Sequence, residues 1–231
     1  MDDRDRILVI VDGSLCSLVG LALAQERSDP VAWVPPVGTD VGDAPVGTHH
    51  LSAVRTQLDR LGVEQIVFPP DDTQAPSELG DGALGANTTV SLALLRAAHD
   101  ALHLRCRSVL WPICCDGSLE ETFRATEIAA TVSRLVGLDQ PGSLSDVDLS
   151  VRTPLADMSR DQVADLAYDL DAPVECCWSM RTREEQVQSD ELREIRTAWQ
   201  NAVVLAAKMR GWEATVQLPG DANDTPARAY L

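Results

Sequence analysis

The chain has 231 residues and a formal net charge of −17, with 36 acidic against 19 basic residues and an apolar content of 45%. This apolar content is ordinary for a chain with a sizeable core and argues against wholesale disorder. The acidic balance is expected to repel nucleic acids and anionic membranes except at a local basic patch, so neither is an expected partner.

The start of the chain does not resemble a targeting segment. Residues 1–6 are charged, and the apolar run behind them ends at Asp12, which is too short for a signal peptide. No stretch approaches the roughly 18 consecutive apolar residues of a membrane-spanning helix. We therefore expect a cytoplasmic protein.

The first elements predicted are a buried strand, a short turn and an apolar helix. Ile7–Val11 is a continuous apolar run, Asp12-Gly13-Ser14 supplies small turn residues, and the helical run Leu15–Glu26 follows at once. Backbone N–H groups in such a turn and the positive end of the helix dipole both favour an anion. The turn is therefore the first candidate binding site.

Strand-like and helix-like runs alternate along the rest of the chain. The further strands are expected at 31–34, 65–68, 108–113, 148–151 and 214–218. The further helices are expected at 50–61, 88–102, 119–136, 160–170 and 184–209. The early strands lack polar alternation, which is typical of a parallel sheet covered on both faces. The sequence predicts an α/β fold with a doubly wound, mainly parallel sheet and helices on both faces.

Irregular segments suggest where the site and the boundaries lie. Residues 35–48 and 69–85 are rich in proline, glycine and aspartate, and both follow predicted strands, where α/β proteins build ligand sites. We divide the chain into an α/β domain at 1–180, a helical region at 181–218 and a tail at 219–231.

The cysteines do not form a zinc pattern. They occur as the adjacent pairs Cys114-Cys115 and Cys176-Cys177 and as two single residues, without the separated pairs of a zinc site. We expect reduced thiols that pack as small hydrophobic side chains.

The histidines give only a weak indication of metal binding. His49-His50 has no further ligand at a metal-binding spacing. His99 and His103 lie four residues apart on a predicted helix, a spacing that can hold a metal, although a solvated helix face is the simpler interpretation.

Several distant segments match one known pattern in order and spacing. They are the turn 12–17 against a Ser-Gly-Gly-x-Asp-Ser loop, Asn87 at a helix start, Asp116 and Arg124 after the fourth strand, Thr-Pro-Leu with Asp and a helix start at 153–160, and a Pro-x-Glu strand ending in Trp-Ser at 173–179. In these segments the chain resembles the 7-cyano-7-deazaguanine synthases of the PP-loop (adenine nucleotide α-hydrolase-like) superfamily. The resemblance covers nearly the whole chain and implies a Rossmann-like fold.

The resemblance implies an ATP-dependent C–N ligase of queuosine biosynthesis. The family activates 7-carboxy-7-deazaguanine with ATP as an acyl-adenylate in the presence of Mg²⁺, and ammonia then leads to the nitrile. The residues implied are Asp12, Gly13, Ser14 and Ser17 for cofactor binding, and Asp116, Arg124 and Arg160 for catalysis.

The three catalytic candidates also have simpler interpretations. Asp116 could simply be a turn residue at the end of a strand, and Arg160 could be a solvated surface residue. Arg124 could pair with glutamates on its own helix. Arg160 stands where the family has lysine, and its guanidinium could still pair with a phosphate or carboxylate.

Several working groups of the family are replaced. Cys16 stands at the loop aspartate, Ser14 at the second loop glycine and Ala86 at an arginine. Asp12 stands at the first loop serine, which would place a carboxylate beside the pyrophosphate. The two negative charges repel each other unless a metal bridges them. No cysteine follows Cys177, so zinc is not expected, and the predicted helix 184–209 takes the place of the zinc segment.

Two hypotheses remain open from the sequence. The chain is either a ligase of this type, in which Asp12 takes over the metal role, or a catalytically inactive relative that binds a nucleotide or a partner. In the second case a homodimer through the long C-terminal helix is one expected assembly.

Overall fold

The structure is a computed structural model that describes residues 5–39, 41–42, 46–69, 86–139, 149–181, 187 and 189–212. The strands are β1 (Arg6–Ile10), β2 (Asp29–Trp33), β3 (Ile66–Val67), β4 (Ser108–Leu110) and β5 (Ser150–Arg152). The α-helices are α1 (Leu15–Gln25), α2 (Thr48–Leu61), α3 (Ala86–His103), α4 (Leu119–Asp139), α5 (Arg160–Asp169), α6 (Trp178–Arg181) and α7 (Asp190–Met209). A 3₁₀ turn, η1 (Val174–Cys176), precedes α6.

The strands form one parallel sheet in the order β3-β2-β1-β4-β5. Leu8 of the central strand β1 is in register with Val31 of β2 on one side and Val109 of β4 on the other. This is the doubly wound α/β fold that the sequence predicts, and it is confirmed. In such a sheet the loops after the strands meet at the carboxyl edge, and the strand order reverses between β1 and β4, where ligands commonly bind.

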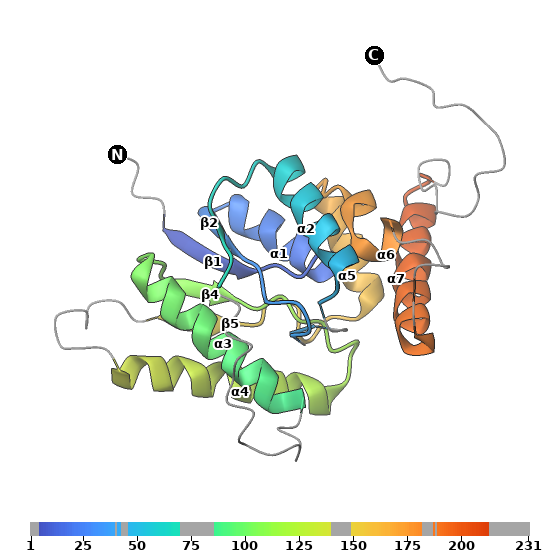
Figure 1. Cartoon of the computed structure of the whole chain (residues 1–231). Helices are drawn as coiled ribbons and strands as arrows, with labels where there is room; N and C mark the ends of the chain where they lie inside the picture. Colours follow the sequence, from blue (N-terminus) through green and yellow to red (C-terminus); the bar gives the residue numbers. More distant parts are fainter. Residues whose placement is uncertain are drawn as a thin grey trace.

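Helices cover both faces of the sheet, and alternate strand residues pack against different layers. Figure 1 shows α3 and α4 below the sheet, with α1, α2 and α5 above it. Leu8 and Ile10 belong to a buried cluster with α3 and α4, whereas Val9 packs with α1 and α2. A third buried cluster joins α1 to α5 and α7.

The last third of the chain differs most from the sequence prediction. The helix expected from residue 184 begins at Asp190, where Ser189 in extended conformation caps it by accepting a hydrogen bond from the Leu192 N–H. The strand expected before Trp-Ser is replaced by η1 and α6. There, local hydrogen bonds such as Cys177 N–H to the Val174 carbonyl satisfy backbone groups that a strand would pair within a sheet.

Some predictions fall outside the described residues, namely the strand at 214–218, the tail at 219–231 and nearly all of the segment 69–85. The division of the chain into domains stays a prediction.

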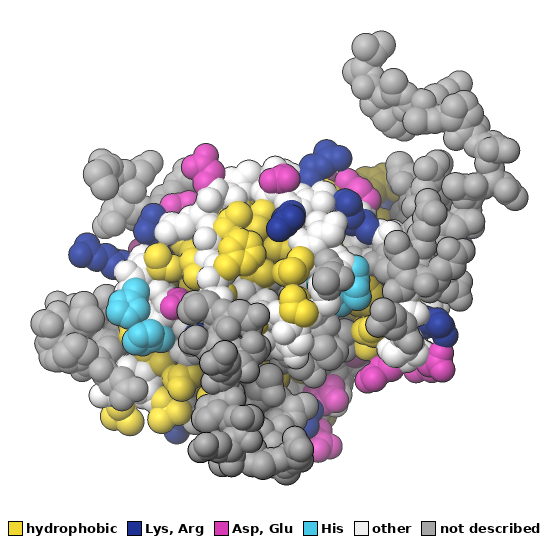
Figure 2. All heavy atoms as spheres, viewed as in Figure 1, with side chains coloured by type: hydrophobic (Ala, Val, Ile, Leu, Met, Phe, Trp, Pro, Cys, Tyr) yellow, Lys and Arg dark blue, Asp and Glu magenta, His cyan; other side chains and the backbone are white. Residues whose placement is uncertain are grey.

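Within the described ranges, none of the helices has both the length and the apolar character needed to cross a bilayer. Figure 2 shows acidic and basic side chains interspersed along the upper rim of one face.

Candidate functional site

The loop between β1 and α1 carries four predicted site residues, and its polar groups bind one another. Asp12 Oδ1 accepts a hydrogen bond from the Ser14 N–H at 2.9 Å. Ser14 Oγ, at the N-cap of α1, accepts from the Ser17 N–H at 3.2 Å, and Ser17 Oγ donates to the Ser14 carbonyl at 3.0 Å. The Ser14 and Ser17 N–H groups could donate to a phosphate in such a turn, but here they donate to side chains of the loop itself.

Helix α2 holds this loop through Gln57, a residue to which the sequence prediction did not point. The Gln57 side chain is fully buried, and its Nε2 donates to the carbonyls of Gly13 at 3.1 Å and Ser14 at 3.0 Å. Its Oε1 accepts from Ser17 Oγ at 3.3 Å. The Trp178 N–H of α6 also donates to the Gly13 carbonyl, at 3.0 Å. The sequence did contain a signal for this role: Gln57 is a single amide on the apolar face of an amphipathic helix. A polar group at a buried position needs hydrogen-bond partners, so such a residue points to a contact with a neighbouring segment.

The loop is closed to solvent and, as folded here, does not fit the pyrophosphate of ATP. Asp12 and Ser17 are only 7% and 1% exposed. Leu15 and Cys16, in the first turn of α1, belong to a buried apolar cluster that also contains Trp199. Buried side chains thus enclose the helix N-terminus whose positive end would have to face the phosphates.

Asp12 acts as a turn residue in this geometry. One of its carboxylate oxygens holds the Ser14 amide, and the other lies so close to Gly42 that a Cβ there would come within 2.6 Å of it. Among the described residues, no three histidine, cysteine, aspartate or glutamate side chains gather in a metal-binding arrangement.

A cluster of aromatic rings lies beside the loop. The ring centres of His50 and Trp178 are 4.7 Å apart, and those of His49 and His50 are 4.3 Å apart. His50 Nδ1 accepts the Gly47 N–H at 3.0 Å, so the ring is neutral with its proton on Nε2. Burial lowers the pKa of His50 to about 4, while the nearby Asp12 carboxylate acts in the opposite direction. The surroundings of His50 therefore favour the uncharged form of its ring.

The structure brings together two of the predicted catalytic residues, Asp116 and Arg160. Asp116 follows β4 in the left-handed region, with a φ of 49°. Its Oδ1 accepts the Arg160 N–H at 3.1 Å and its Oδ2 lies 3.0 Å from Arg160 Nη1, so the carboxylate caps α5 and forms an ion pair. The Arg160 guanidinium carbon lies 5.7 Å from the centre of the Trp199 ring, within range of a cation–π interaction. Both members of the ion pair remain partly exposed.

The third catalytic candidate, Arg124, does not join this pair. It lies on the exposed side of α4, where its Nη2 is 3.9 Å from Glu121 Oε1. This is the ion pair within one helix that the sequence left open as an alternative. The geometry therefore pairs Asp116 with Arg160, whereas Arg124 pairs with Glu121 of its own helix.

All six cysteines are buried thiols outside disulfides, which confirms the expectation that they pack as small hydrophobic groups. Burial raises the pKa of Cys106 to about 11 and the pKa of Cys177 well above its ordinary value. The Cys177 Sγ accepts a hydrogen bond from Gln57 Nε2 at 3.6 Å. The thiolate forms needed for redox or metal chemistry are disfavoured at these two positions.

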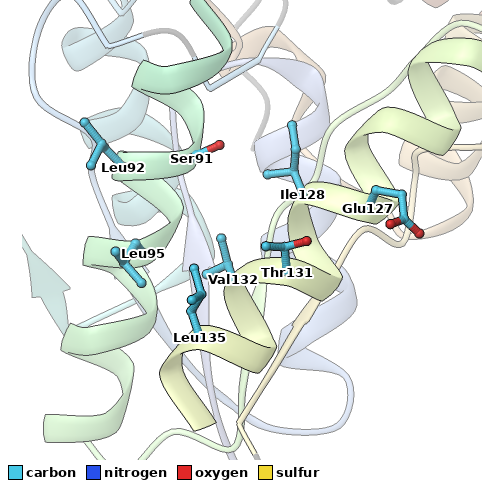
Figure 3. A pocket seen from close by; sticks show the side chains of 8 residues that line it. All are labelled: Ser91, Leu92, Leu95, Glu127, Ile128, Thr131, Val132 and Leu135. Atoms are coloured by element: carbon cyan, nitrogen blue, oxygen red, sulfur yellow. The ribbon is translucent and has the colours of Figure 1, made fainter. Parts of the chain in front are cut away.

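A separate apolar groove of about 390 Å³ lies between α3 and α4, on the face of the sheet opposite to α1, α2 and α5. Figure 3 shows the side chains that line it: Ser91, Leu92 and Leu95 from α3, and Glu127, Ile128, Thr131, Val132 and Leu135 from α4. None of the predicted site residues lines this groove, so it is separate from the candidate site.

Neither the comparison with protein-family models nor the search of curated proteins finds a match for this chain. Among solved structures, the chain is similar to the U34-tRNA thiolase NcsA from Methanococcus maripaludis with its [4Fe-4S] cluster. The alignment covers 100% of this chain and 80% of the thiolase at 14% sequence identity, with a TM-score of 0.49. The α/β fold of the present chain rests on its own parallel sheet.

Proposed function

We propose that this protein is a non-catalytic relative of the PP-loop proteins that binds a nucleotide-like ligand at the carboxyl edge of its sheet without consuming ATP. The observation that supports this most directly is the bond between Asp12 Oδ1 and the Ser14 N–H, at 2.9 Å in a buried turn. A backbone amide suited to phosphate binds a carboxylate of the loop itself. That carboxylate would also repel a phosphate placed beside it.

The proposed ligand contacts are Asp116 and Arg160. They are partly exposed, they come from loops or helix starts that follow two neighbouring strands, and Arg160 stacks against Trp199. The planar guanidinium has donors left beyond the one that meets Asp116, and such donors match a phosphate or carboxylate in a bidentate arrangement. The carboxylate of a 7-deazapurine and the phosphate of a nucleotide are both compatible with this chemistry.

The alternative function is the ligase that the sequence resemblance implies. The two functions are separated by incubating the protein with Mg-ATP, 7-carboxy-7-deazaguanine and ammonium, and by measuring AMP and pyrophosphate. We expect no turnover. Any binding of Mg-ATP in a calorimetric titration is expected to be lost in Arg160→Met and unchanged in Asp12→Ala, because the loop does not take up the phosphates. Turnover that is abolished by Asp12→Ala would overturn the proposal and establish the enzyme.

Binding without turnover is tested by calorimetric titration with 7-carboxy-7-deazaguanine and with a nucleoside monophosphate. Binding is expected to be lost in Arg160→Met and kept in Arg124→Met, because Arg124 is an exposed arginine that lies apart from the Asp116–Arg160 pair. Equal loss in both variants, or no binding by the unmodified protein, would refute a nucleotide-like ligand at this pair.

A further inference from the structure

Helix α7 buries a positive charge on its inner face. Arg196 is only 6% exposed and shares this face with Trp199 and Val203. Throughout the described part of the chain, every ion pair joins other residues, and Arg196 Nε has no hydrogen-bond partner. A guanidinium cannot lose its proton under ordinary conditions, so the buried group keeps its charge without an observed counter-ion.

The other arginines of this region behave differently. Arg193, one turn earlier on α7, pairs with Asp190. Arg210, at the C-cap of α7, pairs with Asp165 at 2.7 Å and with Asp169 at 2.8 Å. Carboxylates of α7 and α5 therefore pair with these two partly exposed guanidinium groups, and none among the described residues pairs with the buried one.

A second unpartnered polar group belongs to the same contact between helices. Ser179 of α6 is 1% exposed, and its Oγ has no hydrogen-bond partner. Gln200 Nε2 donates to the Ser179 carbonyl at 2.8 Å, which attaches α6 to α7 at Gln200. Residues four apart on a helix are neighbours on one face, so Arg196 lies next to Gln200 and one turn from this attachment.

We propose that the contact between α6 and α7 is a binding site for an oxyanion, in which the Arg196 guanidinium pairs with a phosphate or carboxylate group and Ser179 Oγ donates a hydrogen bond to it. Burial of a charge is strongly unfavourable unless the charge is paired, and a bound oxyanion supplies the pairing. The planar fork of arginine matches two oxygens of one phosphate or carboxylate group. The residues of this site differ from the Asp116–Arg160 pair, and the inference does not depend on whether the protein uses ATP.

The test uses the full chain with inorganic phosphate and acetate as probes, at an ionic strength kept constant with sodium chloride. The Arg160→Met background removes anion binding at the Asp116–Arg160 pair. We expect one of these anions to raise the Tm of Arg160→Met and of the double variant Arg160→Met/Arg193→Met, and to leave the Tm of Arg160→Met/Arg196→Met unchanged. Arg193 is the matched control because it lies on the same helix and already has Asp190 as its partner. A rise with phosphate alone identifies a phosphorylated ligand, and a rise with acetate alone identifies a carboxylate.

Two further variants separate binding from folding. Arg196→Lys keeps the charge but lacks the planar fork, and Ser179→Ala removes one donor. Each is expected to weaken the affinity for the effective anion by at least about tenfold in a calorimetric titration. The proposal is overturned if chloride, phosphate and acetate give the unmodified protein the same Tm. An equal rise in Tm for Arg160→Met and Arg160→Met/Arg196→Met would overturn it as well.

Discussion

The side-chain amide of Gln57 donates to the carbonyl oxygen of Gly13 at 3.1 Å, so that helix α2 holds the turn that follows the central strand. Replacement of Gln57 by leucine is expected to lower the free energy of unfolding by roughly 2 to 3 kcal/mol, because buried carbonyls lose their donor. Urea denaturation measures this change. Arg55→Ala, at an exposed position of the same helix, is the control and is expected to stay within about 0.5 kcal/mol of the unmodified protein. Similar costs in the two variants would contradict this role of Gln57.

Gly13 and Gly62 provide a matched pair for testing how tightly the turn is enclosed. Both have a positive φ, of 83° and 64°, but a Cβ at Gly13 would lie 2.7 Å from the His50 carbonyl, whereas a Cβ at Gly62 would meet nothing within 4 Å. Gly62→Ala is expected to cost about 1 kcal/mol from backbone strain alone. Gly13→Ala is expected to cost about 2 kcal/mol more, since the chain must also move. If thermal unfolding gives equal losses, the turn is more open than the structure indicates.

His50 is expected to make the protein sensitive to mild acid. The pKa of this buried ring is about 4, below its ordinary value of 6.5, so the unfolded chain takes up the proton first as the pH falls. Its contribution to stability is complete above about pH 6.5, declines between about pH 6.5 and 4, and amounts to about 3 kcal/mol in total. Urea denaturation at a series of pH values across this range measures the decline.

The control for this prediction is His50→Asn, because asparagine does not titrate and its Oδ1 can still accept the Gly47 N–H. Carboxyl groups also titrate towards the acidic end of the range, so the quantity to compare is the slope of the unfolding free energy against pH in the two proteins. The slope is expected to be smaller in His50→Asn. Identical slopes would show that His50 is not the group responsible.

Placing at position 16 the aspartate that the 7-cyano-7-deazaguanine synthases have in their loop is expected to damage the protein rather than to create an ATP site. Cys16 is 5% exposed and lies in the same apolar cluster as Leu15 and Trp199. Cys16→Asp is expected to cost about 3 kcal/mol or more, because it buries a carboxylate, whereas Cys16→Ser is expected to cost roughly 1 to 2 kcal/mol. Denaturation and calorimetry with Mg-ATP test both parts. A stable Cys16→Asp variant that binds ATP would show that the loop can open.

The layered fold could be predicted because its signal is local and repeated. The apolar run of β1 and the alternation of strands with amphipathic helices follow directly from which residues must be buried. The region around Trp178 was harder to predict, since its apolar residues suit a strand or a helix equally well. Only contacts with α2 and α7 decide that it forms η1 and α6, and such contacts are invisible in a single sequence.

The sequence could predict only those site residues whose position follows from the order of the strands. Asp116 and Arg160 follow neighbouring strands, so the fold alone brings them to one edge of the sheet. Gln57 and Arg196 were not predicted, because each looks like an ordinary polar residue on an amphipathic helix. Their burial depends on how α2 and α7 rotate about their axes when they pack, which is a property of the whole tertiary structure.

The bond from the Trp178 N–H to the Gly13 carbonyl has a consequence for how the chain acquires its structure. Gly13 emerges early in synthesis, but one of the groups that closes its turn belongs to a helix made only after the five described strands. A nascent chain that ends before α6 would contain these five strands and still leave this turn incomplete. This hydrogen bond to the turn after β1 is therefore expected to form late in folding, when α6 and α7 pack against the rest of the chain.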